Sequence, residues 1–271
     1  MIGKTEKVRR NGAAAAFIDA RLAAGRVAFP LRDLVRETGL SATAAKNQLL
    51  RLGSQIVRVS RPQQFFLAVS PEHRLVGAPP VLWWLDDYFK WLEHPYYLAL
   101  QSAASVYGSN PQALQVTQVM TDVPRREIEI GRLRLRFFVK RGIEKTATQA
   151  PPNAFAPIKV STPEATAFDL VRYVSGIGGM GRAVETLVPL LPLIRVPELK
   201  RVLDMENETT TGQRLGYVIE KSGNKALAKV IRDWLPSQMS VVPLASSNAD
   251  QATARINQRW RIIENAEDLA L

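Results

Sequence analysis

The sequence predicts an α+β protein of two domains, and three observations indicate this. Two helical segments separated by a short turn with a glycine are followed by two β-rich runs in residues 1–78, which is the order of a winged helix-turn-helix. Short β-rich runs alternate with helical periodicity in residues 79–271, which is typical of a mixed α/β domain. Residues 75–80 are rich in Gly and Pro, so we place the linker between the two domains there.

The composition favours a globular protein inside the cell. Hydrophobic residues make up 46% of the 271 residues, and the absence of cysteine excludes disulfides and a thiolate zinc site. Met1 to Lys4 is followed by charge rather than by a hydrophobic signal region, and no apolar run approaches the roughly 20 residues that span a bilayer. We therefore expect a cytoplasmic protein with no membrane partner, metal or cofactor.

The N-terminal region begins with a helix and a short strand. Residues 13–24 are rich in alanine and predict a helix that Gly25 ends, and residues 27–29 predict a strand. A second helix can begin at Pro30 and end at Gly39, because Pro is favoured at the first turn and Gly just past the last.

A third helix is predicted to start at Ser41, a good N-cap, and to end at Gly53. Ala45, Leu49 and Leu52 form a narrow apolar stripe on it, opposite a polar face of a length suited to a DNA major groove. Together with the following hairpin, this helix supplies the DNA-binding residues that we predict: Ser41, Thr43, Lys46, Asn47, Gln48, Arg51, Arg58 and Arg61.

The hairpin and the charge distribution favour a DNA-binding winged helix-turn-helix over the alternative, which is an ordinary helical hairpin with a solvated polar face. Residues 54–60 and 65–70 are β-rich runs joined by Arg-Pro-Gln-Gln, as expected of a wing. Residues 1–78 carry thirteen Lys and Arg against five Asp and Glu, whereas the other 193 residues carry twenty-three against twenty. This basic excess favours a phosphate-binding surface over a merely solvated helix face.

The first part of the C-terminal domain is predicted to contain two helices and a strand. Pro80 can begin a helix that runs to about Glu93 and is buried between the domains, because apolar residues occur on most of its faces. Residues 96–107 predict another helix, which ends at Gly108, and residues 116–120 predict a strand.

A hairpin around Gly131, formed by residues 127–130 and 132–139, is predicted to carry a second basic surface. Alternate residues of a strand point to the same face, so the arginines of its second strand are aligned. The alternative is a solvated face on which Glu127 and Glu129 neutralise them. The residues assigned to this surface are Arg132, Arg134, Arg136, Lys140 and Arg141.

The remainder is predicted to be mainly helical. A short strand at residues 158–160 leads to a helix whose cap is either the Ser161–Glu164 capping box or Thr162 with Pro163 after it. The glycine-rich residues 176–181 read as a helix connection rather than a phosphate loop, since no Lys-Ser/Thr follows. Further helices are predicted at residues 182–190, 197–206, 211–222 and 224–235, then a polar loop at 246–251 and a final strand at 256–262.

Two stretches carry a resemblance to a known family: His94 to Gly108 (HPYYLALQSAASVYG) and Ile158 to Leu170 (IKVSTPEATAFDL). With the basic N-terminal region, they resemble the AbiEi family, the antitoxins of type IV abortive-infection toxin–antitoxin systems. The resemblance implies that the N-terminal domain binds double-stranded operator DNA and represses its own operon. It also implies that the C-terminal domain neutralises a cognate nucleotidyltransferase toxin, AbiEii, without a stable complex. It supplies no catalytic residue, so we do not expect an enzyme.

Two other functions remain open at the level of the sequence. Asp122, Glu127, Glu129 and Asp169 are the carboxylates that a magnesium-dependent nuclease would need to bring together. The other alternative is a repressor whose C-terminal domain senses a small ligand.

Overall fold

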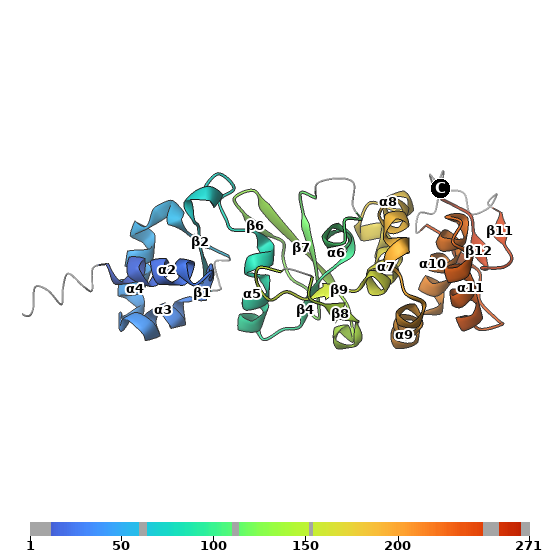
Figure 1. Ribbon diagram of the computed structural model, residues 1–271, viewed down its shortest axis with the longest axis horizontal. Coiled ribbons are helices and arrows are strands. Elements are labelled where there is room, and N and C mark those ends of the chain that lie inside the picture. The colour runs from blue at the N-terminus through green and yellow to red at the C-terminus, as the bar shows by residue number, and fades with distance from the viewer. Residues whose placement is uncertain (1–11, 60–63, 110–113, 152–153, 246–254, 267–271) are drawn as a thin grey trace, which may run out of the picture.

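The computed structural model describes residues 12–59, 64–109, 114–151, 154–245 and 255–266. The chain is a mixed α+β protein, as the sequence predicts, and its elements follow one another along the long axis of an elongated molecule (Figure 1). The predicted wing residue Arg61 and the predicted loop at 246–251 lie outside the described residues.

Residues 12–59 and 64–68 form three α-helices and a three-stranded antiparallel sheet of order β1-β3-β2. The second and third helices are separated by Gly39, whose φ of 67° is the left-handed conformation that glycine adopts most readily. The elements are α2 (Ala13–Ala23), β1 (Ala28–Pro30), α3 (Leu31–Thr38), α4 (Ala42–Arg51), β2 (Ile56–Arg58) and β3 (Phe65–Ala68).

The middle of the molecule is a six-stranded mixed sheet of order β6-β7-β5-β4-β9-β8. Helix α5 covers one face and helices α6 and α7 lie on the other side (Figure 1). The elements are α5 (Leu85–Leu92), β4 (Tyr96–Leu98), α6 (Leu100–Val106), β5 (Thr117–Thr121), β6 (Ile128–Ile130), β7 (Leu133–Val139), β8 (Thr148–Gln149), β9 (Val160–Ser161) and α7 (Pro163–Arg172).

Two predictions for this region are wrong in part. Residues 96–98 form strand β4 rather than the start of a helix, and the helix begins only at Leu100. Strand β4 is buried on both faces, so it reads as a continuous apolar run that periodicity cannot distinguish from a buried helix. The helix predicted from Pro80 is interrupted at Trp84, which separates a 3₁₀ turn at 81–83 from α5.

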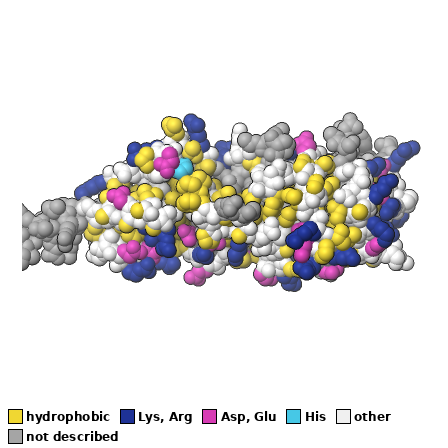
Figure 2. All heavy atoms as spheres, in the orientation of Figure 1, with side chains coloured by type: hydrophobic (Ala, Val, Ile, Leu, Met, Phe, Trp, Pro, Cys, Tyr) yellow, Lys and Arg dark blue, Asp and Glu magenta, His cyan; other side chains and the backbone are white. Residues whose placement is uncertain are grey.

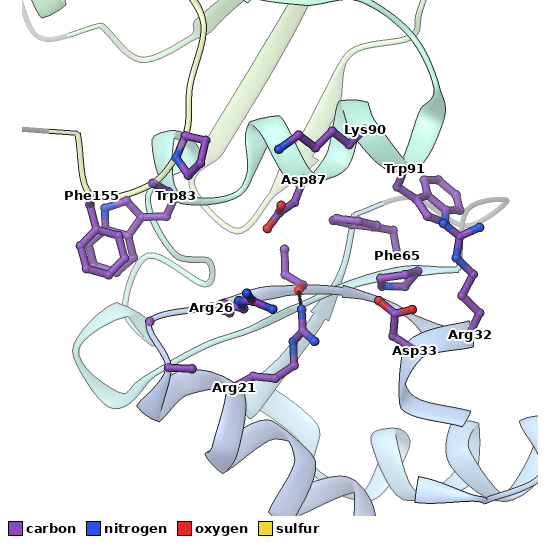
Figure 3. Close-up of a pocket in the computed structure, with 16 residues that line it drawn as sticks. Arg21, Arg26, Arg32, Asp33, Phe65, Trp83, Asp87, Lys90, Trp91 and Phe155 are labelled. Atoms are coloured by element: carbon purple, nitrogen blue, oxygen red, sulfur yellow. Dashed lines mark hydrogen bonds between the residues drawn. The ribbon is translucent and has the colours of Figure 1, made fainter. Parts of the chain in front are cut away.

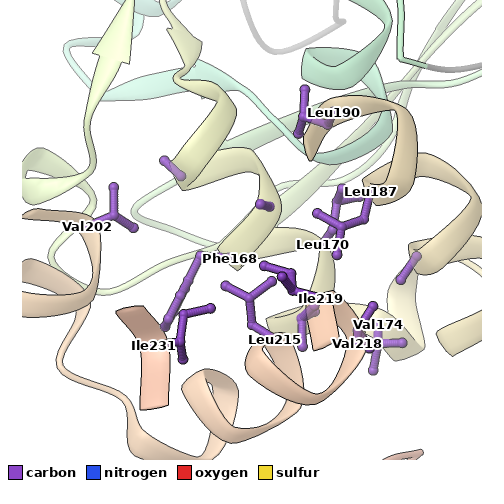
Figure 4. Packing of buried hydrophobic residues seen from close by; sticks show 14 of the residues in the cluster. Phe168, Leu170, Val174, Leu187, Leu190, Val202, Leu215, Val218, Ile219 and Ile231 are labelled. Atoms are coloured by element: carbon purple, nitrogen blue, oxygen red, sulfur yellow. The ribbon is translucent and has the colours of Figure 1, made fainter. Parts of the chain in front are cut away.

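The helical segments that follow α7 among the described residues share a buried cluster with it. Phe168 and Leu170 of α7 share a buried cluster with Leu215, Ile219 and Ile231 (Figure 4). The elements are α8 (Met180–Leu187), a 3₁₀ segment (Val188–Leu193), α9 (Val196–Glu206), α10 (Thr209–Lys221) and α11 (Lys225–Trp234), followed by the short strands β10 (Val242–Pro243), β11 (Ile256–Asn257) and β12 (Ile262–Ile263).

Two local expectations in this part are resolved by specific contacts. The side chain of Thr162 accepts a hydrogen bond from the Ala165 backbone N–H at 3.3 Å, so Thr162 and not Ser161 caps α7. The predicted final strand is instead two short strands around a turn, and Trp260 in that turn is buried against Gly216 of α10. None of the helices in the described residues is long and apolar enough to cross a membrane.

Candidate nucleic-acid interface

Helix α4 presents one polar face to solvent. The side chain of Ser41 caps it by accepting a hydrogen bond from the Ala44 backbone N–H at 3.2 Å. Ala45 and Leu49 are buried against the other N-terminal helices, whereas Thr43 and Asn47 are exposed on the opposite side. The apolar positions therefore turn toward the core, and the polar face predicted to bind DNA turns toward solvent.

Three cations on and beside the exposed face of α4 have no carboxylate partner among the described residues, unlike Arg36 of α3, which pairs with Asp33 at 3.0 Å. Lys46 and Arg51 of α4 and Arg58 of β2 are exposed, and none of them forms an ion pair with another described residue. Uncompensated cations beside an exposed helix are the arrangement that phosphate binding requires.

A groove of about 380 Å³ lies between α4 and the β2–β3 hairpin. Lys46 and Arg58 line it together with Leu50, whose side chain is 81% exposed. Sequence reasoning missed Leu50, because it lies beside the apolar stripe and reads as part of the core. The position of Leu50 could have indicated its exposure, because it lies one residue after Leu49 and outside the i, i+4 spacing of the apolar stripe. An exposed apolar side chain on such a face can contact a thymine methyl group.

One predicted DNA-binding residue is engaged inside the fold. The side-chain oxygen of Gln48 accepts a hydrogen bond from the Ala14 backbone N–H at 2.9 Å, and this bond ties α4 to the first turn of α2. We therefore omit Gln48 from the proposed interface.

The second predicted basic surface is largely neutralised. Arg134 forms an ion pair with Glu129 at 3.0 Å, and Arg136 forms one with Glu127 at 2.5 Å, across β6 and β7. This is the solvated alternative considered above. Arg132 and Arg141 remain exposed, at either end of the strand.

Lys140 does not belong to a surface, and the sequence prediction is wrong for it. The residue is 2% exposed, and its Nζ donates to Asp169 at 2.9 Å and to Glu206 at 2.6 Å. The strand ends at Val139, so Lys140 no longer follows the alternation that places Arg136 outward.

The buried charges around Lys140 connect β4, β7, α7 and α9. The Tyr97 hydroxyl donates to Asp169 at 2.6 Å, and Arg172 donates to Glu206 at 3.1 Å. Burial, together with the Asp169 carboxylate, raises the pKa of Tyr97 well above its ordinary value. These groups are buried and bonded to one another, which favours a role in holding the domain together.

The carboxylates of the nuclease alternative are dispersed. Asp122 accepts hydrogen bonds from His94 and Thr121, while Asp169 is held by Lys140. Burial opposes the ionised form of Asp122, but the His94 and Thr121 hydrogen bonds outweigh it and lower the pKa. Within the described part of the chain, no group of three or more His, Cys, Asp or Glu side chains is placed to hold a metal ion.

A further basic region lies at the C-terminal end of the molecule, where Figure 2 shows Lys and Arg side chains gathered. Lys225 and Arg255 are exposed there without an ion pair among the described residues, whereas Arg259 pairs with Glu220 at 2.8 Å. The sequence gives little sign of this region, because the charge summed over residues 79–271 is nearly balanced.

Two comparisons with known proteins show what this chain resembles. Residues 97–221, from β4 to the end of α10, match the model of the AbiEi antitoxin C-terminal domain. No curated protein matches the chain. The crystal structure of the RV2827C protein from Mycobacterium tuberculosis is similar over 95% of this chain and 92% of that one, with a TM-score of 0.69 and 16% identity, which shows a shared fold. The chain thus resembles the AbiEi antitoxin C-terminal domain over residues 97–221 and the mycobacterial protein in its fold.

Proposed function

We propose that this protein is a non-enzymatic antitoxin that also represses transcription. Residues 12–78 act as a winged helix-turn-helix that binds operator DNA, and the C-terminal part opposes a nucleotidyltransferase toxin of a type IV system without forming a stable complex. The observation that carries the antitoxin role is the match of residues 97–221 to the AbiEi antitoxin C-terminal domain.

The DNA-binding half of the proposal is supported by the chemistry of the α4 face. Asn47 and Arg51 are exposed one helical turn apart, and an Asn amide can pair with adenine while an Arg guanidinium can pair with guanine. Lys46 and Arg58 flank them as cations available to phosphates, and Leu50 adds an apolar contact.

The DNA arm is tested by binding of the full-length chain to the DNA upstream of its own gene, measured by fluorescence anisotropy. We expect Asn47→Ala to reduce discrimination between operator and unrelated DNA by about 1–3 kcal/mol. Lys200→Ala, at an exposed position on α9, is the control and should leave operator binding unchanged. Operator affinity unchanged in both Asn47→Ala and Arg51→Ala would refute the α4 interface.

The antitoxin arm is tested in cells that express the cognate nucleotidyltransferase, with the antitoxin under an unrelated promoter so that repression does not affect its level. We expect wild type and the double variant Asn47→Ala/Arg51→Ala to protect equally, because the substitutions lie outside residues 97–221. Growth arrest despite a folded, expressed wild-type chain would refute the antitoxin role.

A further inference from the structure

A cleft of about 590 Å³ opens at the surface between the N-terminal elements and α5, beside their shared core (Figure 3). Its floor is formed by the end of α2, by β1 and by the start of α3, while α5 and the turn before it form the roof. Residues 155–157 close one end. The cleft lies outside the α4 face and outside residues 97–221 except at that end.

Aromatic rings are presented at the end closed by residues 155–157. The rings of Trp83 and Phe155 lie 4.4 Å apart at 31°, and Phe155 is 59% exposed. The rings of His73 and Trp83 form a T-shaped pair with their centroids 5.1 Å apart, which helps to hold the Trp83 ring in place. A large exposed ring beside a concave surface loses water favourably when a flat aromatic group stacks on it.

The floor of the cleft is cationic. Arg26 is exposed and forms no ion pair with another described residue. Arg21 is fixed over the rings of Phe17 and Phe29 and by a 2.8 Å hydrogen bond to the Ala28 carbonyl, and its Nε is buried without a hydrogen-bond partner. Its Nη1 also lies 3.9 Å from Glu37, a loose ion pair. A preordered guanidinium is suited to an anionic oxygen.

One carboxylate faces these arginines from the roof. Asp87 of α5 points into the cleft toward Arg26 (Figure 3). Burial raises the pKa of Asp87, and the nearby Lys90, Arg21 and Arg26 charges oppose that rise. The other acidic side chain of the lining, Asp33, is already paired with Arg36 at 3.0 Å. The cleft therefore offers cations for an anion and one acceptor for an N–H donor.

We propose that the cleft binds a nucleotide. The base stacks on the exposed ring of Phe155 beside Trp83, its amino or imino N–H donates to Asp87, and the phosphates contact the guanidinium groups of Arg26 and Arg21. Since β1 and α3 belong to the proposed DNA-binding region and α5 to the central sheet, a bound nucleotide bridges the two halves of the molecule.

The test uses tryptophan fluorescence of the full-length chain, because Trp83 lies in the cleft. Titration with ATP, GTP and CTP should give saturable quenching by at least one of them. Phe155→Ala and Arg26→Gln should each weaken the binding about tenfold or more, since the loss of one stacking or charge contact corresponds to at least 1.4 kcal/mol. Arg141→Gln, which is exposed and not part of the lining, is the control and should bind as wild type does.

A thermal-shift measurement on Trp83→Phe separates the reporter from the site. This variant should lose the part of the quenching that Trp83 reports, leaving any that comes from Trp91, yet keep the nucleotide-induced shift. Three results would overturn the proposal. They are no saturable binding by the folded chain, equal binding by inorganic phosphate alone, and unchanged binding in both cleft variants. Binding of single-stranded oligonucleotides without binding of any nucleotide would likewise reject it and assign the cleft to nucleic acid.

Discussion

At the scale of single residues, Lys140 shows how a charged side chain can be a core residue. Its ammonium group lies between the carboxylates of Asp169 and Glu206, and Tyr97 donates to the free oxygen of Asp169. Removing one partner of a buried ion pair leaves the other charge without compensation, and this costs more than the pair itself contributes.

Lys140→Met should therefore lower the free energy of unfolding by about 3–5 kcal/mol, measured by urea denaturation. Adding Asp169→Asn should restore part of this loss, because it removes the orphaned charge. Lys145→Met, at an exposed position five residues away, should change the free energy by no more than about 0.5 kcal/mol. If Lys140→Met behaves like Lys145→Met, the network does not stabilise the fold.

The buried tyrosines predict how stability depends on alkaline pH. Burial raises the pKa of Tyr107 to about 12, although the hydrogen bond from Gln149 lowers it in part. The folded chain therefore keeps this phenol protonated above pH ~10, where the unfolded chain ionises it. Its contribution to stability is complete below pH ~10 and is lost as pH rises toward 12. The same direction holds for Tyr96, Tyr97, Tyr173 and Tyr217.

We expect urea midpoints to fall steeply above pH ~10, and tyrosinate absorbance to appear together with unfolding rather than before it. Tyr107→Phe should make the decline shallower without changing the midpoint at neutral pH by much. Ionisation of these five tyrosines near pH 10 in the still-folded chain would contradict the burial of their phenols.

At the scale of elements, α10 depends on a glycine within its length. A Cβ at Gly216 would overlap the buried ring of Trp260, so Gly216→Ala should destabilise the protein by about 1–3 kcal/mol despite the better helix propensity of alanine. Gly181→Ala in α8 meets open space and should stabilise it by up to about 1 kcal/mol. Thermal denaturation of the pair checks both signs, and equal shifts would show that Trp260 yields to the methyl group.

The sequence predicted those elements best whose ends carry chemical signals. Ser41 and Gly39 locate the boundaries of α3 and α4, and Gly131 locates the hairpin of β6 and β7. The sequence wrongly predicted a helix at Tyr96 to Leu98, because a strand buried on both faces shows no alternation of apolar and polar residues. It also failed at Lys140, since neither the end of a strand nor a carboxylate 66 residues away is visible locally.

For the proposed DNA interface, the sequence predicted which side of α4 is exposed, but not which of its side chains are free to contact DNA. Helical periodicity places Thr43 and Asn47 outward, which the structure shows, but it cannot reveal that Gln48 bonds to α2 or that Leu50 is exposed. These depend on how the helices pack together, which is non-local.

A comparison of two sets of three cations can test which element binds phosphates. Replacing Lys46, Arg51 and Arg58 with Gln should flatten the plot of log K against log salt by up to about 0.9 for each lost phosphate contact. Replacing Arg132, Arg134 and Arg136 with Gln removes the same charge, yet should leave the slope unchanged, since two of these arginines are paired with glutamates. The reverse result would move the DNA interface to β7.

At the scale of the whole molecule, the N-terminal elements and the central sheet share a core. The ring of Phe65 in β3 packs against those of Tyr88 and Trp91 in α5, with centroid-to-centroid distances of 5.3 and 5.5 Å. The predicted linker is also packed, because the Val76 carbonyl accepts from the Arg132 backbone N–H at 2.8 Å. A fragment beginning at residue 79 would expose these surfaces, which is why point substitutions in the full chain are the better way to separate repression from protection.

The shared core predicts that the chain unfolds as one unit. All five tryptophans lie at residue 83 or later, so their fluorescence reports only on the part after the linker. Phe65→Ala, although it lies before the linker, should shift the urea midpoint of that fluorescence and of the backbone circular dichroism together, by a loss of about 3–5 kcal/mol. Leu50→Ala, exposed in the same region, should shift neither by more than about 0.5 kcal/mol. If Phe65→Ala leaves the tryptophan transition in place while the circular dichroism splits into two steps, the two halves fold independently and the contact across α5 carries no cooperativity.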